Sequence, residues 1–345
     1  MRTAGLLAAL AVASVAALGG EEPVALRAES FTVPPATGPV THVIVQNLRP
    51  AAYAGKVGLR MPEGWELDRV EQAVTLGPNE TRRVAFAIRK AANSDANTYP
   101  VEVVATGDDG SRAARRQSLF CASAPYGQPT IDGRAREWAD AIPVTFTSGG
   151  KRTVVSTYWN RSDFCLLAEV EEEKLIGCRE GAAFDAVQVA IAPRDAPAAA
   201  TASAKAGRYE FLLAASGPSR PKDTCFLLAT PDTLLSATQA ARGLVSLAVK
   251  EAKLVVRRKA GVTTYECSLP FAAMPAVVPA EGREFFFSML VHDPDGTGLR
   301  DLGEAAGLWP SQRNRLAWSL WPGAKWGADA PFDSHVEWGF CSSKH

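Results

Sequence analysis

Carboxylates gather on one turn in the second half of the chain, where they offer oxygen ligands for a cation. Asp293 and Asp295 flank a proline, Asp301 follows, and Gly296 permits a sharp bend between them. Hard oxygen ligands at such spacing suit calcium. The spacing differs from that of an EF-hand loop, which has glycine at its sixth position and glutamate at its twelfth. These three aspartates predict a calcium site, with a turn of solvated carboxylates as the alternative.

Aromatic side chains form the second group that could do chemistry. Four tryptophans fall within one stretch rich in proline and glycine, namely Trp309, Trp318, Trp321 and Trp326. Exposed aromatic residues on a loop are typical of binding sites. The stretch therefore predicts an aromatic platform for a ligand. The alternative is that these rings point inward and close the edge of a β-sandwich.

The sequence carries no recognisable catalytic motif. It has no GxSxG nucleophile elbow, no HExxH zinc motif and no phosphate-binding loop. A run of carboxylates on a predicted strand and the turn after it indicates a solvated edge; its members are Glu169, Glu171, Glu172 and Glu173. A glycosidase acid/base pair is defined by its separation in space, which the sequence does not give. We therefore predict that the protein is not an enzyme, and leave open that it is an accessory to a glycoside hydrolase.

The balance of charge argues against a nucleic-acid partner. Lysine plus arginine and aspartate plus glutamate each number 37 among the 345 residues, so the formal net charge is zero. A nucleic-acid-binding protein would need a basic patch or stripe. The length allows two domains, each with a sizeable core.

The first 20 residues have the pattern of a secretory signal peptide. Met1 and Arg2 begin a short positive region, and residues 4–18 are almost entirely apolar and small. This run is short for a membrane span, and small residues suited to cleavage follow it. We expect residues 1–20 to be removed and the mature chain to be secreted, periplasmic or at the cell surface, without a membrane span. An N-terminal anchor helix is the alternative.

The six cysteines are compatible with disulfides in an exported chain, with 15 full pairings open. No CxxC occurs, and the four histidines are scattered, so no zinc spacing is present. Cys121 and Cys341 lie at the beginning and end of the predicted second domain, where first and last strands commonly neighbour one another. We predict a disulfide between them. Free, buried cysteines that pack as small apolar residues are the alternative.

The elements that must position these residues are predicted to be all-β. Residues 21–119 contain short apolar strands separated by turn signals such as GPN at 77–79 and DDG at 108–110. Strands at regular spacing without helical periodicity indicate β-sandwiches rather than a parallel sheet covered by helices. We predict two β-sandwich domains, residues 21–119 and 131–345, joined by a linker over residues 120–130.

Four segments of the first domain occur in an order that carries a resemblance. They are VIVQNL (43–48), MPEGW (61–65), LGPNETRRVAFAI (76–88) and YPVEVVATGDDG (99–110). In this order they resemble the small immunoglobulin-like domains found beside bacterial glycosidase and sugar-binding modules. The resemblance implies an immunoglobulin-like sandwich, with Trp65 packed at one of its ends.

Five segments of the second domain are similar, in order, to the family-9-like carbohydrate-binding modules. They are IDGRAREWADA (131–141), STYWNRSDFCLLAEVEE (156–172), FDAVQVAIAP (184–193), YECSLPFAAM (265–274) and FFFSMLVHDPDG (285–296). The resemblance implies a sandwich of jelly-roll type that binds a polysaccharide or oligosaccharide. It also implies structural calcium, which related domains often carry.

The same resemblance implies where a sugar would bind. In sugar-binding members, aromatic rings stack on the apolar face of the sugar, and polar side chains fix its hydroxyls. Phe184 stands near the family's tryptophan, and Gln188 stands where glutamate is usual. We therefore expect the site at Phe184 and Gln188 together with the platform Trp309, Trp318, Trp321 and Trp326.

Two other readings remain open. A cell-envelope protein with a structural or protein-interaction role could retain such a sandwich after losing sugar binding. A haem-binding relative would use residues such as Met274, Met289 and His292. Both alternatives keep the all-β fold and differ from the sugar-binding prediction only in what the second domain binds.

Overall fold

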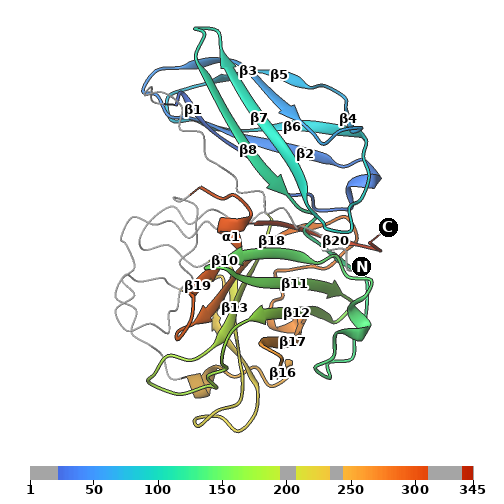
Figure 1. The fold of residues 1–345 in the computed structure, drawn as a ribbon, viewed down its shortest axis with the longest axis vertical. Coiled ribbons are helices and arrows are strands. Elements are labelled where there is room, and N and C mark those ends of the chain that lie inside the picture. The colour runs from blue at the N-terminus through green and yellow to red at the C-terminus, as the bar shows by residue number, and fades with distance from the viewer. Residues whose placement is uncertain (1–21, 195–206, 234–243, 310–335, 345) are drawn as a thin grey trace, which may run out of the picture.

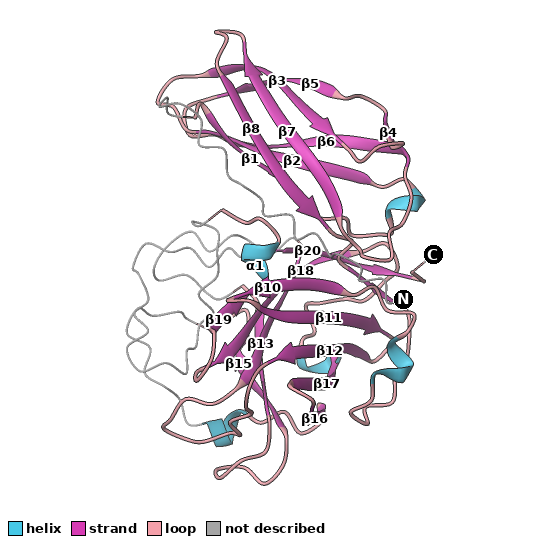
Figure 2. Ribbon diagram, in the orientation of Figure 1, coloured by secondary structure: helices cyan, strands magenta, loops and turns pink. Residues whose placement is uncertain are grey.

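The computed structural model describes residues 22–194, 207–233, 244–309 and 336–344. Strands dominate this part of the chain, which confirms the all-β prediction (Figure 1, Figure 2). The described helices are single turns: η1 (Pro35–Thr37), η2 (Ala135–Trp138), η3 (Leu244–Leu247), η4 (Phe271–Ala273) and α1 (Leu302–Ala305). Among the described residues, no helix has the length and apolar character needed to cross a membrane. The predicted signal peptide, residues 1–20, lies outside the described residues.

The first domain consists of two four-stranded antiparallel sheets. The order of one sheet is β1 (Val24–Ala28), β2 (Val40–Asn47), β6 (Thr81–Lys90) and β4 (Glu66–Leu67). The order of the other is β5 (Glu71–Leu76), β3 (Tyr53–Arg60), β7 (Tyr99–Gly107) and β8 (Arg112–Leu119). The two sheets face each other and form a sandwich (Figure 1).

Alternation along the strands builds the core of this sandwich. In β7, Tyr99, Val101, Val103 and Ala105 are buried, while the residues between them are more exposed. Successive side chains of a strand point to opposite faces, so one face packs inward and the other meets water. Trp65 packs against Tyr99 at one end, with ring centroids 5.3 Å apart. This is the core position that the sequence predicts for that indole.

The second domain also pairs two sheets. The five-stranded sheet has the order β10 (Val144–Ser148), β11 (Lys151–Trp159), β12 (Asp163–Glu171), β17 (Val262–Pro270) and β16 (Lys253–Lys259). The seven-stranded sheet has the order β15 (Thr224–Ala229), β14 (Tyr209–Ala214), β13 (Ala186–Pro193), β18 (Glu284–Asp293), β20 (Val336–Cys341) and β9 (Ser123–Pro125), with β19 (Gly298–Asp301) also paired to β18. The largest apolar cluster of the described chain lies between these two sheets.

The seven-stranded sheet is buried on both faces. In β13, Val187, Val189 and Ile191 point into the core between the sheets. The alternate residues Gln188 and Ala190 are also buried, although they point the other way. This second face, which we call the outer face of the seven-stranded sheet, therefore carries buried side chains of its own.

The first part of the predicted linker, residues 120–125, belongs to the folded core and is not a free connection. Residues 123–125 form β9, which pairs in parallel with β20. Just before it, Phe31 of the first domain donates its backbone N–H to Phe120 O at 3.0 Å and accepts from Ala122 N at 2.7 Å. The sequence indicates a linker because the segment is short and contains proline, but sheet pairing satisfies its backbone groups.

Directed bonds join the two domains. Arg27 of β1 and Glu337 of β20 form a buried, two-point ion pair, with Nη2 to Oε1 at 2.6 Å and Nη1 to Oε2 at 3.2 Å. Arg115 of β8 donates to the carbonyl oxygens of Leu26 and Gly307 at 2.8 and 2.7 Å. Figure 1 shows the first domain resting on the part of the second that contains β18, β20 and α1. The sandwiches therefore form one docked assembly.

Candidate functional site

Gln188 lies at the centre of a buried polar network on the outer face of the seven-stranded sheet. Its side-chain amide donates to Glu210 Oε2 at 3.2 Å, and its side-chain oxygen lies 2.8 Å from His292 Nε2. Glu210 accepts a second bond, at 2.7 Å, from Arg208 Nε. We call Arg208, Glu210, Gln188 and His292 the polar row. Each of them is at most 1% exposed.

Strand register brings the polar row together. In the ladder of β13, β14 and β18, Gln188 faces Leu212 on one side and Leu290 on the other. Glu210 and His292 lie two residues from these partners, so their side chains share the face that Gln188 occupies. Arg208 directly precedes β14, Glu210 lies on it and His292 lies on β18. Residues from positions 188 to 292 of the sequence therefore meet at three adjacent strands.

The direction of each hydrogen bond in the row follows from the chemistry of its members. Carboxylate Glu210 accepts only, so Gln188 presents its NH2 to Glu210 and its oxygen to His292. Burial lowers the pKa of His292 to about 4, so its imidazole is neutral near pH 7. Nε2 then carries the proton, and Nδ1 is left as an acceptor. That Nδ1 is buried and has no hydrogen-bond partner among the described residues.

Phe184 does not reach the surface. It is 1% exposed and packs in an apolar cluster with Ala186 and Leu212, beside the polar row on the outer face. Phe184 therefore presents no exposed ring for stacking in this structure, because it lies just before a strand that is buried on both faces. Gln188, by contrast, is placed among groups that hydrogen-bond.

The tryptophan platform is described only at its first member. Trp309 is half-buried, and its Nε1 donates to the carbonyl oxygen of Leu26 in the first domain at 3.3 Å. It therefore contributes to the contact between domains. Trp318, Trp321 and Trp326 lie outside the described residues. Trp138 and Trp338, elsewhere in this domain, are both buried.

The residues proposed for haem do not converge. Met274 and Met289 lie in the apolar core between the two sheets. His292 is three residues after Met289 on β18, so its side chain points to the opposite face. The described residues thus place these sulfurs and the imidazole on different sides of the seven-stranded sheet.

A cluster of three buried carboxylates lies at one end of the second sandwich, between its sheets. Glu172, Asp185 and Asp293 each offer one oxygen, and the three oxygens lie within 4.8 Å of one another. We call these residues the acidic triad. Glu172 directly follows β12 of the five-stranded sheet, whereas Asp185 directly precedes β13 and Asp293 ends β18 of the seven-stranded sheet. The triad therefore spans both sheets.

Alternation explains why the triad points inward. Val170, Val187 and Val291 belong to the core, and each lies two residues from the triad member of its own segment. Residues two apart on a strand share a face, so each carboxylate continues an apolar row at its end. The predicted solvated edge is thus wrong for Glu172, which is 3% exposed although both of its glutamate neighbours are at the surface or close to it.

Asp293 is the one predicted metal ligand that belongs to the triad. Its Oδ2 accepts from Arg300 Nη2 at 2.6 Å and from the Thr297 backbone at 2.9 Å. Asp295 instead lies 3.9 Å from the Lys174 ammonium. Asp301 accepts from the Gly303 backbone at 2.7 Å and caps α1. The predicted set Asp293, Asp295 and Asp301 therefore does not converge, and the carboxylates that join Asp293 come from distant strands.

Two members of the triad are short of partners. Burial raises the pKa of both Glu172 and Asp185 to about 7, and neighbouring carboxylates add to the effect. Asp185 Oδ2 accepts from the Ile176 backbone. Asp185 Oδ1 and Glu172 Oε1 are buried without a hydrogen-bond partner among the described residues. Arg258 Nη1 lies 3.9 Å from Glu172 Oε1, too far for a hydrogen bond.

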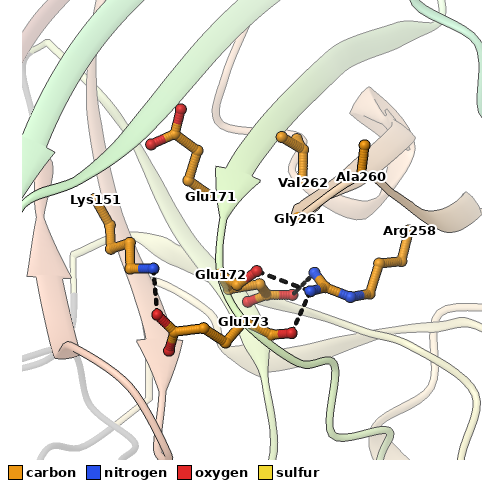
Figure 3. A pocket seen from close by; sticks show the side chains of 8 residues that line it. All are labelled: Lys151, Glu171, Glu172, Glu173, Arg258, Ala260, Gly261 and Val262. Atoms are coloured by element: carbon orange, nitrogen blue, oxygen red, sulfur yellow. Dashed lines mark hydrogen bonds and ion pairs between the residues drawn. The ribbon is translucent and has the colours of Figure 1, made fainter.

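An open recess of about 530 Å³ leads from the surface to Glu172 (Figure 3). Lys151 pairs with Glu173 at 2.5 Å on one side, and Arg258 binds backbone oxygens of residues 172 and 173 on the other. Glu171 points away from this group in Figure 3. The charged groups of Lys151, Glu173 and Arg258 in this recess are therefore already paired. Glu172 also lines the recess.

Cys121 and Cys341, the predicted disulfide partners, are both buried in one apolar cluster. They are free thiols in this structure, as are the other four cysteines, so the predicted bond is not formed here. All six cysteines are buried free thiols, which is the alternative that the sequence leaves open, in which thiols pack as small apolar groups.

Comparison with known proteins identifies a family for part of the first domain. Residues 34–107 match the family model described as NPCBM-associated, NEW3 domain of alpha-galactosidase. This match confirms the resemblance predicted for residues 21–119. A comparison with curated proteins gave no match.

Solved structures similar to this chain include carbohydrate-binding modules of family 9 from Caldicellulosiruptor kristjanssonii. One, in complex with glucose, has a TM-score of 0.33 and 14% identity over 51% of this chain and 81% of the module. Another, in complex with cellotriose, has a TM-score of 0.37 and 13% identity over 64% of this chain and 93% of the module. The family predicted for residues 131–345 thus occurs among the similar structures. At these TM-scores the likeness carries no argument about the ligand or the site.

Proposed function

We propose that this chain is an exported, non-catalytic carbohydrate-binding protein whose second domain holds a sugar at the polar row. The observation that carries the proposal is the network of Arg208, Glu210, Gln188 and His292 on the outer face of the seven-stranded sheet. Sugar recognition needs side chains that both donate and accept in fixed directions, because a sugar hydroxyl does both. The row contains both kinds of group within one network.

The unpartnered imidazole nitrogen supports this role. His292 Nδ1 is an acceptor without a partner among the described residues, and a buried polar atom in that state costs free energy. A sugar hydroxyl that donates to it would remove that cost. All four side chains are buried, so binding requires the outer face to open to the ligand. The aromatic stacking surface would come from Trp318, Trp321 and Trp326.

The first domain supports the same function. The family that residues 34–107 match is named for a domain of alpha-galactosidase, an enzyme that acts on sugars. The buried contacts between Arg27 and Glu337 hold that domain against the sandwich that would bind the sugar. Our proposal for the whole protein is an accessory that brings a glycan-degrading partner to its polymer.

A glycan array on the mature protein, followed by calorimetric titration of the best ligand, tests the proposal. Gln188→Ala removes two hydrogen bonds of the row, and we expect an affinity loss of about tenfold or more, because one such bond contributes about 1 kcal/mol. Trp321→Ala and Trp326→Ala should each cost about 2 kcal/mol, the threshold of a hot spot. Lys56→Ala, at an exposed position of the first domain, is the control and should bind normally.

Absence of glycan binding would favour the alternative of a structural or protein-interaction role at the cell envelope. If folded protein binds no glycan on the array, the sugar proposal fails. If the tryptophan variants lower the melting temperature while glycan affinity stays intact, the rings are core residues and the platform is wrong. Melting curves for every variant separate loss of binding from loss of fold.

A further inference from the structure

The acidic triad is unusual because three carboxylates meet at the end of an apolar core. Glu172, Asp185 and Asp293 are each at most 3% exposed, and their oxygens approach within 4.8 Å. Buried carboxylates normally pair with cations or bind metals, because an isolated buried charge is costly. The negative charge of the triad therefore needs a positive charge close to it.

The cations of the described chain balance only part of this charge. Arg300 is fully buried and binds Asp293 Oδ2, so it serves one carboxylate. Arg258 is partly exposed and lies 3.9 Å from Glu172, and Lys174 lies near Asp295 rather than the triad. Asp295 adds negative charge on the side of Asp185. Up to two negative charges are then left at Glu172 and Asp185.

The free oxygens provide an independent indication of a ligand. Glu172 Oε1 and Asp185 Oδ1 are buried and lack hydrogen-bond partners among the described residues. Both belong to side chains that are less than a tenth exposed. A buried acceptor without a donor carries a desolvation cost that a bound cation would remove.

We infer that Glu172, Asp185 and Asp293 bind one divalent cation, and that calcium is the ion they select. The donor set contains carboxylate oxygens and no nitrogen or sulfur, which suits a hard cation. Calcium takes six to eight oxygens in flexible geometry, whereas magnesium keeps several waters and is seldom held by an all-protein cage. A 2+ charge matches the charge that Arg300 leaves unbalanced.

The position of the triad gives the ion a structural role. Glu172 comes from the five-stranded sheet, and Asp185 and Asp293 come from the seven-stranded sheet. One ion bound by all three would clamp the two sheets together at this end of the sandwich. Asp185 directly precedes the strand that carries Gln188, and Asp293 ends the strand that carries His292. The ion would therefore hold one end of each of these two strands of the polar row.

The test is calorimetric titration of calcium and, separately, magnesium into the metal-stripped full mature protein, with melting curves in calcium and in chelator. We expect saturable calcium binding and a higher melting temperature in calcium. Asp185→Asn and Glu172→Gln keep size and shape, and each should weaken calcium binding by more than about 100-fold, the upper end of losses from outer-shell changes. Glu171→Gln, which alters the half-buried neighbour that points away from the triad side of the recess, should bind like the parent.

The melting temperature without metal is a second readout, which shows whether a variant that fails to bind calcium is still folded. Without metal, Asp185→Asn should melt above the metal-free parent, because it removes an unbalanced buried charge. If folded, metal-free parent binds no calcium at millimolar concentration, or if Asp185→Asn binds as tightly as the parent, the site is disproved. Preferential binding of magnesium would overturn the choice of ion. None of these readouts uses a glycan, so the result is independent of the sugar proposal.

Discussion

Single residues with several partners hold the second domain in shape, and Glu266 is the clearest case. Its Oε1 accepts from the Trp138 indole at 2.8 Å, and its Oε2 accepts from the backbone of Asp132 at 2.9 Å and of Gly133. Two sequence motifs, IDGRAREWADA and YECSLPFAAM, therefore meet at one buried carboxylate. The opening turn of the domain is fixed by a residue that lies more than a hundred positions away.

We expect Glu266→Ala to destabilise the protein by about 3 kcal/mol or more, because it leaves three donors without their acceptor. Thermal or chemical unfolding measures the effect. Glu251→Ala, at an exposed position, serves as the control and should change stability by less than about 0.5 kcal/mol. An equal small effect for both variants would show that water replaces the carboxylate at this turn.

A second prediction at this scale concerns acid stability. Burial alone would raise the pKa of Glu29, but hydrogen bonds from His42 and Arg83 outweigh it and lower the pKa from 4.5 to about 2. A carboxyl whose folded pKa lies below its unfolded value adds stability above the unfolded pKa and loses it as pH falls. The contribution, about 3 kcal/mol by linkage, should therefore disappear between pH 4.5 and pH 2.

Melting temperatures of the parent and Glu29→Gln across that pH range measure this contribution. The two curves should differ most near neutral pH and converge as the pH approaches 2, the folded pKa. Glu63→Gln, at an exposed position, should follow the parent throughout. A constant difference between the parent and Glu29→Gln at all pH values would mean that the carboxylate charge does not stabilise the fold.

Among the elements, β20 connects the two domains through its backbone. Gly339 of β20 donates to the Ala122 carbonyl at 2.9 Å and lies against Thr32 of the first domain. A Cβ at position 339 would lie 1.9 Å from the Thr32 carbonyl oxygen, far inside any allowed contact. The close approach of two backbones at this point therefore requires glycine.

We expect Gly339→Ala to push the first domain away from β20 and lower the melting temperature. Small-angle scattering should show a larger radius of gyration if docking is lost. Gly77→Ala is a matched control, because its added Cβ meets only the flexible Glu80 side chain, at 3.4 Å. An unchanged scattering profile and melting temperature for Gly339→Ala would show that the interface adapts without this close approach.

At the scale of the whole molecule, the docked domains should unfold together. The buried Arg27–Glu337 pair crosses the interface, and removal of one partner of a buried pair costs about 3–5 kcal/mol. Calorimetry of the parent should show one transition. Glu337→Ala should lower it or split it into two, whereas the double change Arg27→Met with Glu337→Met should recover much of the loss.

Glu281→Ala, an exposed change in the same domain, is the control and should leave one transition at the parental temperature. Two well-separated transitions in the parent itself would contradict a cooperative interface. They would mean that the two sandwiches are independent units despite their contact.

The sequence alone determined what depends on local patterning. Alternating apolar residues and turn signals specify strands, so the all-β class could be predicted, and ordered motifs such as MPEGW and IDGRAREWADA were enough for the family resemblances. The packing of Trp65 at one end of the first sandwich followed in the same way. Gln188 was also identified, because it stands at one position of a recognisable strand.

Only the tertiary structure decided which distant residues meet. Glu172 is one of three adjacent glutamates, and only the packing of two sheets shows that it points inward to Asp185 and Asp293. Arg208 and Glu210 joined Gln188 through strand register, which no local pattern specifies. The predicted set Asp293, Asp295 and Asp301 failed for the same physical reason: neighbours in sequence on a turn diverge, whereas strands that pair or pack bring remote side chains within bonding distance.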